Sequence, residues 1–584
     1  MGIVQGAPSH PANTFHALLH PISAHETLYI KDMSTKPAAV ADLPLEVDQF
    51  ESHNEAWRPT HNQWAIAITV TLATFMEVLD SAIANVSLPH IAGSLGASQD
   101  EATWVLTSYL VANAVILPAS AYLSSFIGRK RFYMICVVLF GLSSALCGLA
   151  PSLPLLIFFR VLQGVGGGGL APSEQSILAD TFQPRDRGKA FAFYGVAVVC
   201  APIIGPTLGG WITDSFNWRW IFFINIPVAI LSLYLTNRLV EDPPWVKRDV
   251  ARTRHFGLNL DYFGFALLAI GFGSLEFVLD KGQEDDWFGS RIILYFAVAC
   301  VVALATLIYW EIRQIRNGHR PILDLTLFKK KTFAVAFTLM FVLGFTLYAT
   351  IVLIPQFAQL LLGYTAELAG LVISPGGLMT MLSMPLVGFL VSRTDPRRLI
   401  AVGFLIVGSS LVAMHTLNLQ VSYAYIAGLR AFQAAGMGFL FIPINFISYV
   451  NVPRTKNNDI SGLSNLARNI GGSTGTAFLT TMLARRTQTH MSYLSAHFAP
   501  SNALFQQQVR ALSQVFYTHA MAPSTAFAAH IAQAFLYQQL YRQASMLAYL
   551  DVTNVLAICC FAMLPLLLLT GKIPKPSGDA PAAH

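Results

Sequence analysis

The chain is 584 residues long, 54% of them hydrophobic and only 12% charged, with a mean hydropathy of +0.53. Soluble proteins carry about 25% charged residues, so this chain has too little polar surface to cover water-soluble globules. The composition therefore predicts a polytopic membrane protein and excludes disordered, collagen-like, coiled-coil and disulfide-scaffold proteins. The formal net charge of +6 does not indicate a nucleic-acid partner, because in a membrane protein the distribution of charge matters more than its total.

Residues 1–63 are polar and form a predicted cytoplasmic tail. They lack a basic start followed by a short apolar run, so no cleavable signal is expected and the first span acts as its own insertion signal. The tail contains six histidines, namely His10, His16, His20, His25, His53 and His61. Their irregular spacing favours a solvated, flexible tail over a metal site, and no metal centre is predicted elsewhere in the chain.

Fourteen apolar stretches follow the tail, each near the length of about 20 residues that crosses a bilayer. They begin near Trp64, Ala102, Phe132, Pro154, Ala190, Trp220, Leu260, Arg291, Thr332, Ala366, Leu399, Val421, Ile460 and Met546. Most of the 37 lysines and arginines fall in alternate loops, and the positive-inside rule then places both termini in the cytoplasm. Adding or removing one span would put basic loops on both faces of the membrane. The seventh and eighth spans flank the acidic turn 284–286, which indicates a membrane hairpin with an external turn.

A short motif in the fourth span recurs in the twelfth. At equal offsets the first copy contains Arg160, Gln163, Gly166 and Gly168, and the second contains Arg430, Gln433, Gly436 and Gly438. Six spans precede the extra pair and six follow it, and the motif occupies the fourth span of each six. Parallel six-helix repeats with a site between them at mid-membrane are typical of secondary transporters.

The spans and the repeat divide the chain into five predicted parts. These are a cytoplasmic N-terminal tail (1–63), a six-helix bundle (64–239), a linker with two extra transmembrane helices (240–330), a second six-helix bundle (331–571) and a cytoplasmic C-terminal tail (572–584).

Four stretches carry a resemblance to a known family. They are residues 79–89 in the first span, 201–210 in the fifth, 218–227 at the entrance to the sixth, and Arg468 with 471–473 in the thirteenth. Together they resemble the 14-helix drug:proton antiporters of the major facilitator superfamily, within it the EmrB/QacA group. The resemblance runs from about Trp64 to the last span. It implies an all-α major facilitator fold, with two six-helix bundles plus two extra central helices, in a bacterial inner membrane.

Residues 201–210 are similar to the superfamily's antiporter motif, whose small and cyclic residues here are Pro202, Gly205, Pro206, Gly209 and Gly210. Prolines remove backbone N–H donors from the helix, and glycines leave one helix face without side chains, so the stretch suits a flexible kink and tight packing between the two halves. A kink that serves packing alone is the alternative. By resemblance, the motif favours export over uptake.

The motif after the second span, residues 121–130, keeps Gly128 and Arg129 but lacks the early glycine and the acidic residue of relatives. The cytoplasmic gate that this motif serves in relatives is therefore expected to be held differently. Structural or gating roles are expected for Gly128, Arg129, Gln163, Arg430, Gln433 and Arg468.

Ionisable groups inside spans are the main functional candidates, because each costs at least about 2.5–3.5 kcal/mol in the hydrocarbon region. Asp80 and Arg160 lie roughly 14 Å and 9 Å below the outer end of their spans, at about 1.5 Å per helical residue, so they can meet. We hypothesise that Asp80 is the proton-coupling carboxylate. Desolvation favours its protonated form, whereas the nearby positive charge of Arg160 favours its ionised form. A static clamp between the two helices is the alternative.

Glu77 lies one turn before Asp80 on the same helix face. It is a candidate for a second protonation site or for receiving cationic substrates, and a water-facing side chain without either role is equally compatible with the sequence. Phe75 and Met76 are candidate apolar contacts in the same substrate cavity, although most residues of this kind face lipid.

Residues 485–545 have few charges, and their pattern predicts an external, amphipathic helical segment. It has three candidate roles, which are covering the exit, lying on the membrane, or docking a partner. In the Gram-negative systems that the chain resembles, the pump works with a periplasmic membrane-fusion adaptor and an outer-membrane channel.

The sequence therefore predicts proton-coupled export of amphipathic or hydrophobic drug-like compounds, driven by the proton gradient without a cofactor. A proton-coupled uptake permease for a small solute is the alternative, and a sensor with an inactive transporter fold would be expected to lose the Asp80 and Arg160 pair. Enzymatic activity is not expected, because no nucleophile–base pair, metal cluster or paired catalytic carboxylates are found.

Overall fold

The computed structural model describes residues 57–255, 261–498, 502–519 and 524–570. The regular structure in these ranges is helical, with no strand, which confirms the predicted all-α class. Most of the N-terminal tail and the C-terminal tail lie outside the described residues, and so do all tail histidines except His61. The helices belong to one compact unit, Pro59–His584.

The first helical bundle contains the helices between the tail and the extra pair. They are α3 (Gln63–Leu95), α4 (Gln99–Ile127), α5 (Arg129–Leu149), α6 (Leu153–Gly167), α7 (Leu170–Thr181), α8 (Arg187–Ser215), α9 (Trp220–Phe223) and α10 (Asn225–Leu239). Local signals set several boundaries. Ser98 and Glu101 form a capping box at the start of α4, and Gly128, with φ of +99°, separates α4 from α5. Helix α8 bends by 44° between Arg187–Pro202 and Thr207–Ser215, where prolines remove backbone donors.

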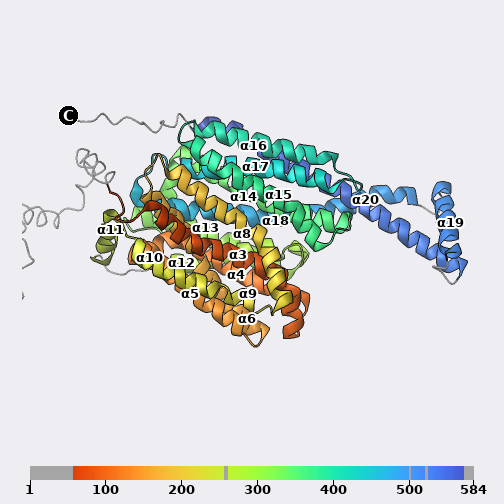
Figure 1. The fold of residues 1–584 in the computed structure, drawn as a ribbon, viewed down its shortest axis with the longest axis horizontal. Helices are drawn as coiled ribbons and strands as arrows, with labels where there is room; N and C mark the ends of the chain where they lie inside the picture. The colour runs from red at the N-terminus through yellow and green to blue at the C-terminus, as the bar shows by residue number, and fades with distance from the viewer. Residues whose placement is uncertain (1–56, 256–260, 499–501, 520–523, 571–584) are drawn as a thin grey trace, which may run out of the picture. The chain divides into compact units, whose positions relative to one another are not determined.

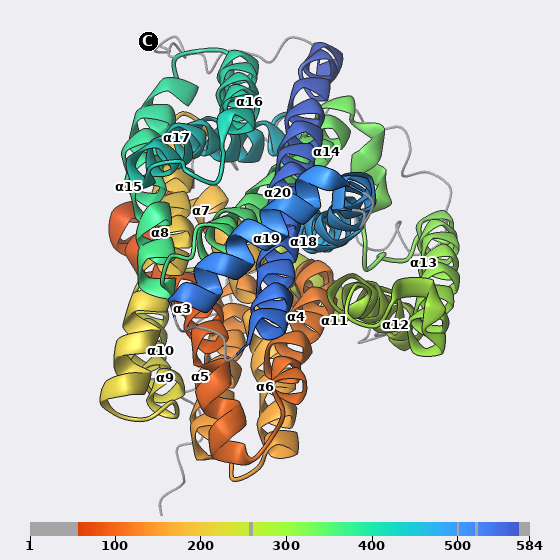
Figure 2. The ribbon, with the colours of Figure 1, turned by 90° about the vertical axis from the view of Figure 1, so that its right-hand side faces the viewer.

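The second helical bundle follows the extra pair of helices. It contains α14 (Lys331–Gln356), α15 (Ala366–Val391), α16 (Pro396–Ala413), α17 (Tyr423–Ser448), α18 (Asn457–Ser495) and α20 (Thr525–Ala562). Between the bundles come α11 (Pro244–His255) and the hairpin of α12 (Tyr262–Lys281) and α13 (Arg291–Arg316), and α12 packs against α4 and α18 (Figures 1 and 2).

Twelve helices in the described residues are long and apolar enough to cross a membrane, or thirteen if the bent α8 is one span. Helix α18 has 39 residues and packs against α14 and α20. It is not counted among these helices, because its sequence is too polar. The fourteen-span count therefore stays a prediction.

Packing partners repeat between the two bundles. In the first bundle α3 packs on α8, and α6 packs on both α4 and α5; in the second α14 packs on α18, and α17 packs on both α15 and α16. The bundles meet where α8 contacts α15 and where α4 and α7 contact α18. The internal repeat of the sequence therefore corresponds to a repeat of helix packing.

The repeated glycines explain part of this correspondence. A Cβ at Gly166 would lie 2.6 Å from the Phe140 backbone nitrogen of α5, and one at Gly436 would lie 2.8 Å from Val407 of α16. Likewise, Gly168 faces α4 and Gly438 faces α15. Both motifs thus use small residues at the same offsets to let one helix approach two neighbours.

We predict that Gly166→Ala destabilises the protein by about 1–3 kcal/mol, because the added methyl group meets backbone that cannot move without shifting a helix. Thermal unfolding of the purified protein in detergent measures this loss. Gly428→Ala is the matched control, since a Cβ at Gly428 has no heavy atom within 4 Å. Equal unfolding temperatures for the two variants would contradict the packing argument.

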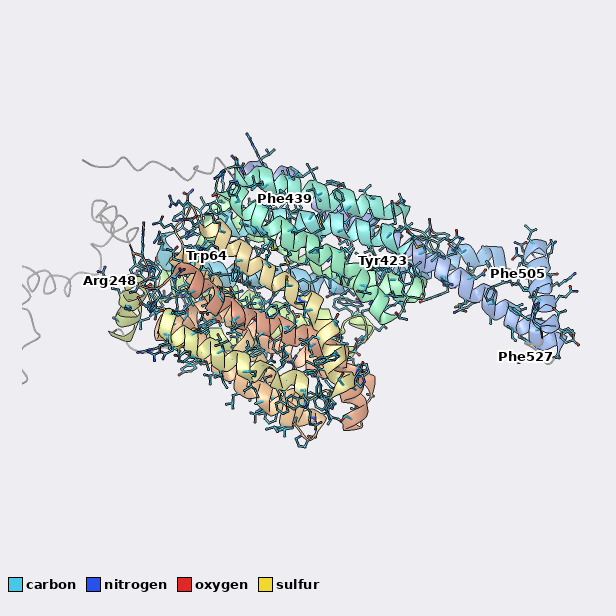
Figure 3. All side chains as sticks on the ribbon, in the orientation of Figure 1. Trp64, Arg248, Tyr423, Phe439, Phe505 and Phe527 are labelled. Carbon is cyan, nitrogen blue, oxygen red and sulfur yellow. The ribbon has the colours of Figure 1, made fainter. Side chains whose placement is uncertain are left out.

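Helix α19 (Ala503–Thr518) and the start of α20 project beyond the other helices (Figure 1). Figure 3 shows Phe505 and Phe527 at this projecting end and Arg248 of α11 at the opposite end. The described part of segment 485–545 is helical, with α18 continuing to Ser495 and α20 beginning at Thr525, well before the predicted start of the last span at Met546. Helix α19 has no buried residue, whereas the start of α20 buries one side, including Ala528, Ala532 and Leu536.

Candidate functional site

A buried ion pair joins two helices of the first bundle. Nη1 of Arg160 on α6 donates to Oδ2 of Asp80 on α3 at 2.6 Å. Two amides donate to the other carboxylate oxygen, Nε2 of Gln163 at 3.0 Å and Nδ2 of Asn225 at 2.7 Å. All four residues are at most 2% exposed. The Asp80 carboxylate therefore receives donors from α6 and from the first residue of α10 in an interior closed to solvent.

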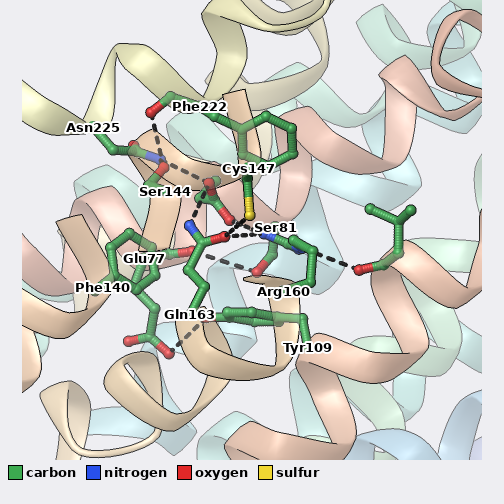
Figure 4. Close-up of polar contacts among 12 residues, drawn as sticks. Glu77, Ser81, Tyr109, Phe140, Ser144, Cys147, Arg160, Gln163, Phe222 and Asn225 are labelled. Atoms are coloured by element: carbon green, nitrogen blue, oxygen red, sulfur yellow. Dashed lines mark hydrogen bonds and ion pairs between the residues drawn. The ribbon is translucent and has the colours of Figure 1, made fainter. Parts of the chain in front are cut away.

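Arg160 also ties α6 to α4 (Figure 4). Its Nε donates to the Val105 carbonyl at 3.0 Å, and its guanidinium lies 4.4 Å from the centre of the Tyr109 ring. Its Nη1 further donates to Gln163 Oε1 at 2.8 Å. Contacts with Asp80, Val105, Tyr109 and Gln163 thus hold this cation in one position, while its buried Nη2 has no hydrogen-bond partner among the described residues.

Asn225 is positioned by a second layer of hydrogen bonds. Its Nδ2 also contacts Ser144 Oγ at 3.0 Å, and that hydroxyl donates to the Phe222 carbonyl at 2.8 Å. Phe222 belongs to the short α9, directly before α10. In the sequence, Asn225 stands out only as part of the stretch 218–227, and Ser144 does not stand out at all, because a Ser or Asn in a span carries no pattern that identifies its partner.

Glu77 lies one turn before Asp80 and faces α4. Its Oε1 accepts hydrogen bonds from Asn113 Nδ2 at 3.0 Å and from the Tyr109 hydroxyl at 3.4 Å, whereas Oε2 has no hydrogen-bond partner among the described residues. Tyr109 therefore contacts both Arg160 and Glu77 (Figure 4). Of the two apolar candidates beside Glu77, Phe75 is partly buried and Met76 is packed into the core with 1% exposure.

Glu174 on α7 is a buried carboxylate that is not among the residues predicted from the sequence. It is fully buried and accepts a hydrogen bond from the Thr71 hydroxyl of α3. A signal was present, because Glu174 is the sole acidic residue between positions 153 and 179 of an apolar stretch.

The stretch 201–210 of α8 packs against α3 beside Asp80. A Cβ at Gly205 would lie 2.5 Å from the Ala82 side chain, and one at Gly209 would lie 2.9 Å from Ile83. The described contacts of these two glycines are therefore within one bundle, whereas packing between the two halves was expected. Helix α8 reaches the second bundle nearer its start, where Gly188 faces α15. Pro202 and Pro206 flank the bend, and Gly210 has no heavy atom within 4 Å of a Cβ position.

Arg129 lies at the end of the helices that carries the basic loops 128–131, 182–189 and 449–456, called the basic end below. Its guanidinium forms a buried ion pair with Asp180 at the end of α7. Asp180 Oδ1 also accepts a hydrogen bond from Asn457 Nδ2 at 2.7 Å, and Asn457 begins α18 of the second bundle. The acid missing from motif 121–130 thus has a substitute from another helix. Gly128 faces Asp242, which accepts a hydrogen bond from the Lys130 backbone N–H.

Further hydrogen bonds join the bundles at the basic end. Ser176 and Ser461 hydroxyls lie 2.6 Å apart, and Asn465 Nδ2 donates to Gln175 Oε1 at 2.9 Å. These contacts join α7 to α18, and we call them, with Asp180–Asn457, the basic-end seam. The seam holds the two bundles together at this end.

Lys456, directly before α18, forms an ion pair with Asp324. Burial would raise the pKa of Asp324, but the hydrogen bond and charge of Lys456 outweigh it and hold that pKa below its usual value. Because a depressed carboxylate pKa adds stability at neutral pH that is lost on acidification, this pair fixes the start of α18 at neutral pH.

The remaining predicted residues lie in the second bundle. Nη1 of Arg430 donates to Gln433 Oε1 at 2.6 Å and lies 3.5 Å from Thr350 Oγ1. Arg468 of α18 contacts the Tyr194 hydroxyl of α8 at 3.5 Å and lies over the Phe441 ring. Arg468 thus contacts both bundles. Across the described ranges, no group of three or more His, Cys, Asp or Glu side chains is arranged to hold a metal ion.

Comparison with known proteins gives consistent matches. The family model described as Major Facilitator Superfamily matches residues 70–476. The chain is 38% identical over 458 residues to the probable multidrug resistance protein EmrY of Escherichia coli (strain K12), covering 78% of this chain and 86% of that protein. It is 37% identical over 439 residues to the multidrug export protein EmrB of the same strain, covering 75% and 83%.

A solved structure agrees with the fold. The crystal structure of the human organic anion transporter MFSD10 aligns with a TM-score of 0.53 over 87% of this chain and 100% of that chain. Its sequence identity is 10%, so this likeness concerns the arrangement of helices alone.

Proposed function

The chain belongs to the major facilitator superfamily as an EmrB-like member, and we propose that it is a drug:proton antiporter that exports amphipathic or hydrophobic compounds. The names of EmrY and EmrB, with more than a third of positions identical over three quarters of this chain, support multidrug export. We place the protein in a bacterial inner membrane with both termini in the cytoplasm, because the basic loops then lie inside.

The observation that carries the coupling proposal is the Asp80–Arg160 ion pair. When Asp80 is ionised, its carboxylate holds donors on α6 and α10 against α3. When a proton enters from outside and neutralises Asp80, the ion pair with Arg160 is lost and the two amide bonds weaken. The contacts between α3 and its neighbours then become weaker, and release of the proton to the cytoplasm restores them. A proton-dependent change in helix packing is the property that exchange requires.

The energy available is sufficient without any cofactor. Each proton that enters yields about 2.3 kcal/mol per 100 mV of membrane potential and about 1.36 kcal/mol per pH unit. One-for-one exchange can therefore hold a compound gradient of a hundredfold or more.

The substrate is proposed to contact the interior near Glu77. Glu77 Oε2 has no partner among the described residues, so it is available as an acceptor for a cationic group. At the projecting end, α19 and the start of α20 present exposed apolar side chains, Leu504, Val515, Tyr517 and Phe527 among them. A periplasmic adaptor linked to an outer-membrane channel is the proposed partner of this end.

The test reconstitutes the purified protein in liposomes with an inward proton gradient and records internal pH while compounds are added. We expect cationic or neutral amphipathic compounds to increase proton entry, and Asp80→Asn to reduce this increase to the level of empty liposomes. Asp214→Asn, which changes an exposed aspartate, is the matched control and should behave as wild type. Full compound-dependent proton entry by Asp80→Asn would reject the coupling role, and compound export without proton movement would reject antiport.

A further inference from the structure

The two repeats place a buried arginine at the same site but surround it with different charges. Arg160 follows Asp80 by 80 residues and pairs with it, and Arg430 follows Thr350 by the same 80 residues and contacts it. Both arginines also donate to the glutamine three residues later. The second bundle therefore repeats the first site with a neutral hydroxyl in place of the carboxylate.

This replacement leaves the second site with excess positive charge. In the ranges that the structure describes, no ion pair joins Arg430 to an acidic side chain, although Arg430 is only 5% exposed. Its Nε and Gln433 Nε2 are buried donors without a hydrogen-bond partner. In the first site the corresponding Nε of Arg160 donates to the Val105 carbonyl, and Gln163 Nε2 donates to Asp80. Nη2 of Arg160 also has no hydrogen-bond partner among the described residues, so each arginine has one buried unpaired nitrogen, and the second site differs in lacking the carboxylate and in leaving the glutamine amide without an acceptor.

A buried cation with unused donors is costly unless an anion neutralises it. We propose that Arg430 and Gln433 form a binding site for a small monovalent anion, which takes the place that the Asp80 carboxylate occupies in the first bundle. The anion accepts hydrogen bonds from the Arg430 guanidinium and the Gln433 amide, which together provide charge and donors suited to a carboxylate or halide.

The surroundings limit the size of this anion. A Cβ at Gly376 of α15 would lie 3.0 Å from Arg430 Cγ, so α15 packs closely against the arginine stem. Arg430 nevertheless keeps some exposed surface, whereas Arg160 has none. A free ion such as chloride satisfies these conditions, and so does the carboxylate group of a longer compound whose apolar part lies elsewhere. The site does not depend on proton coupling by Asp80 and extends the proposed function.

The test measures thermal unfolding of the purified full chain in detergent at constant ionic strength. Chloride and acetate are each titrated against gluconate, and decanoate is compared with methyl decanoate. We expect anions to raise the unfolding temperature of wild type. Thr350→Asp places the carboxylate of the first repeat beside Arg430, so it should raise the half-saturating anion concentration by about tenfold or more.

Two matched variants separate charge from other effects. Thr350→Asn has a similar shape without charge and should keep the wild-type anion response. Thr346→Asp places an acid one turn away, on a residue that contacts Cys560 in the structure, and should not remove the response. Because all readouts are unfolding temperatures, they do not require transport, so failure of the antiport proposal leaves this test intact.

Comparison of the compounds identifies the source of the anion. Stabilisation by chloride and acetate supports a free ion, and stabilisation by decanoate but not by chloride or methyl decanoate supports a carboxylate carried by a compound. No response of wild type to any anion, or an equal response of wild type and Thr350→Asp, overturns the proposal.

Discussion

Arg160→Gln is expected to destabilise the protein by about 3–5 kcal/mol, because it leaves the Asp80 carboxylate charged and buried without its counter-ion. Asp80→Asn should also destabilise, since it leaves the guanidinium unpaired. The double variant Asp80→Asn/Arg160→Gln should be more stable than Arg160→Gln, because amide side chains replace both charges and can hydrogen-bond to each other. Unfolding in detergent, measured for all four proteins, gives the coupling free energy of the pair.

Transport by the same four proteins separates a coupling role from the static clamp. If the ion pair only clamps α3 to α6, the double variant should recover transport together with stability. If Asp80 carries the proton, the double variant should be stable and still show no compound-dependent proton entry. Additive losses in stability, with no coupling free energy between the two positions, would mean that the 2.6 Å contact is not energetically significant.

The Asp80 site could be predicted in part from the sequence because of two regularities. A charge in an apolar span is rare enough to indicate a function or a partner, and helical rise converts sequence position into depth. These regularities identified Asp80 and Arg160 and placed them at compatible depths. The repeat of Arg160 and Arg430 was equally visible, but the pairing of Arg430 with Thr350 was not, because nothing about a threonine in a span indicates that it occupies the place of an acid.

Contacts between separate helices account for what the sequence did not predict. Asp180 and Asn457 come from different bundles and meet only because α7 packs against α18. Helical periodicity describes one helix at a time, so it does not identify which faces of two helices meet. Helix α18 illustrates the same limit, because the polar residues of its first part, such as Asn457, Ser461 and Asn465, are buried among other helices, whereas its last part is largely exposed.

Asp180→Asn is expected to open the basic-end seam. Asp180 is bonded to Arg129 of its own bundle and to Asn457 of the other, and both partners are buried. Replacing its carboxylate with an amide leaves Arg129 without its ion-pair partner, which costs several kcal/mol in a buried site. That cost falls on the arrangement in which α7 and α18 are closed together. The equilibrium between closed and open forms of this end should therefore shift by about tenfold or more toward the open form.

The measurement is the rate at which a thiol reagent labels a cysteine placed in the seam. Ser461→Cys, in a background without the six native cysteines, is buried between α7 and α18 when the basic end is closed. Its labelling should accelerate in proportion to the open fraction when Asp180→Asn is added. Asp186→Asn is the matched control at the same end, because Asp186 forms a surface ion pair with Lys189, and such pairs contribute about 0–1 kcal/mol.

A second variant distinguishes loss of charge balance from loss of the Asn457 hydrogen bond. Arg129→Gln added to Asp180→Asn removes the uncompensated cation but leaves an amide at position 180 beside Asn457. If the buried charge opens the seam, this double variant should label nearly as slowly as the Ser461→Cys parent. If labelling stays fast, the hydrogen bond from Asn457 to the carboxylate is the main contact that closes the two bundles. Unchanged labelling in Asp180→Asn itself would show that the seam is held by Ser176, Gln175 and their partners on α18.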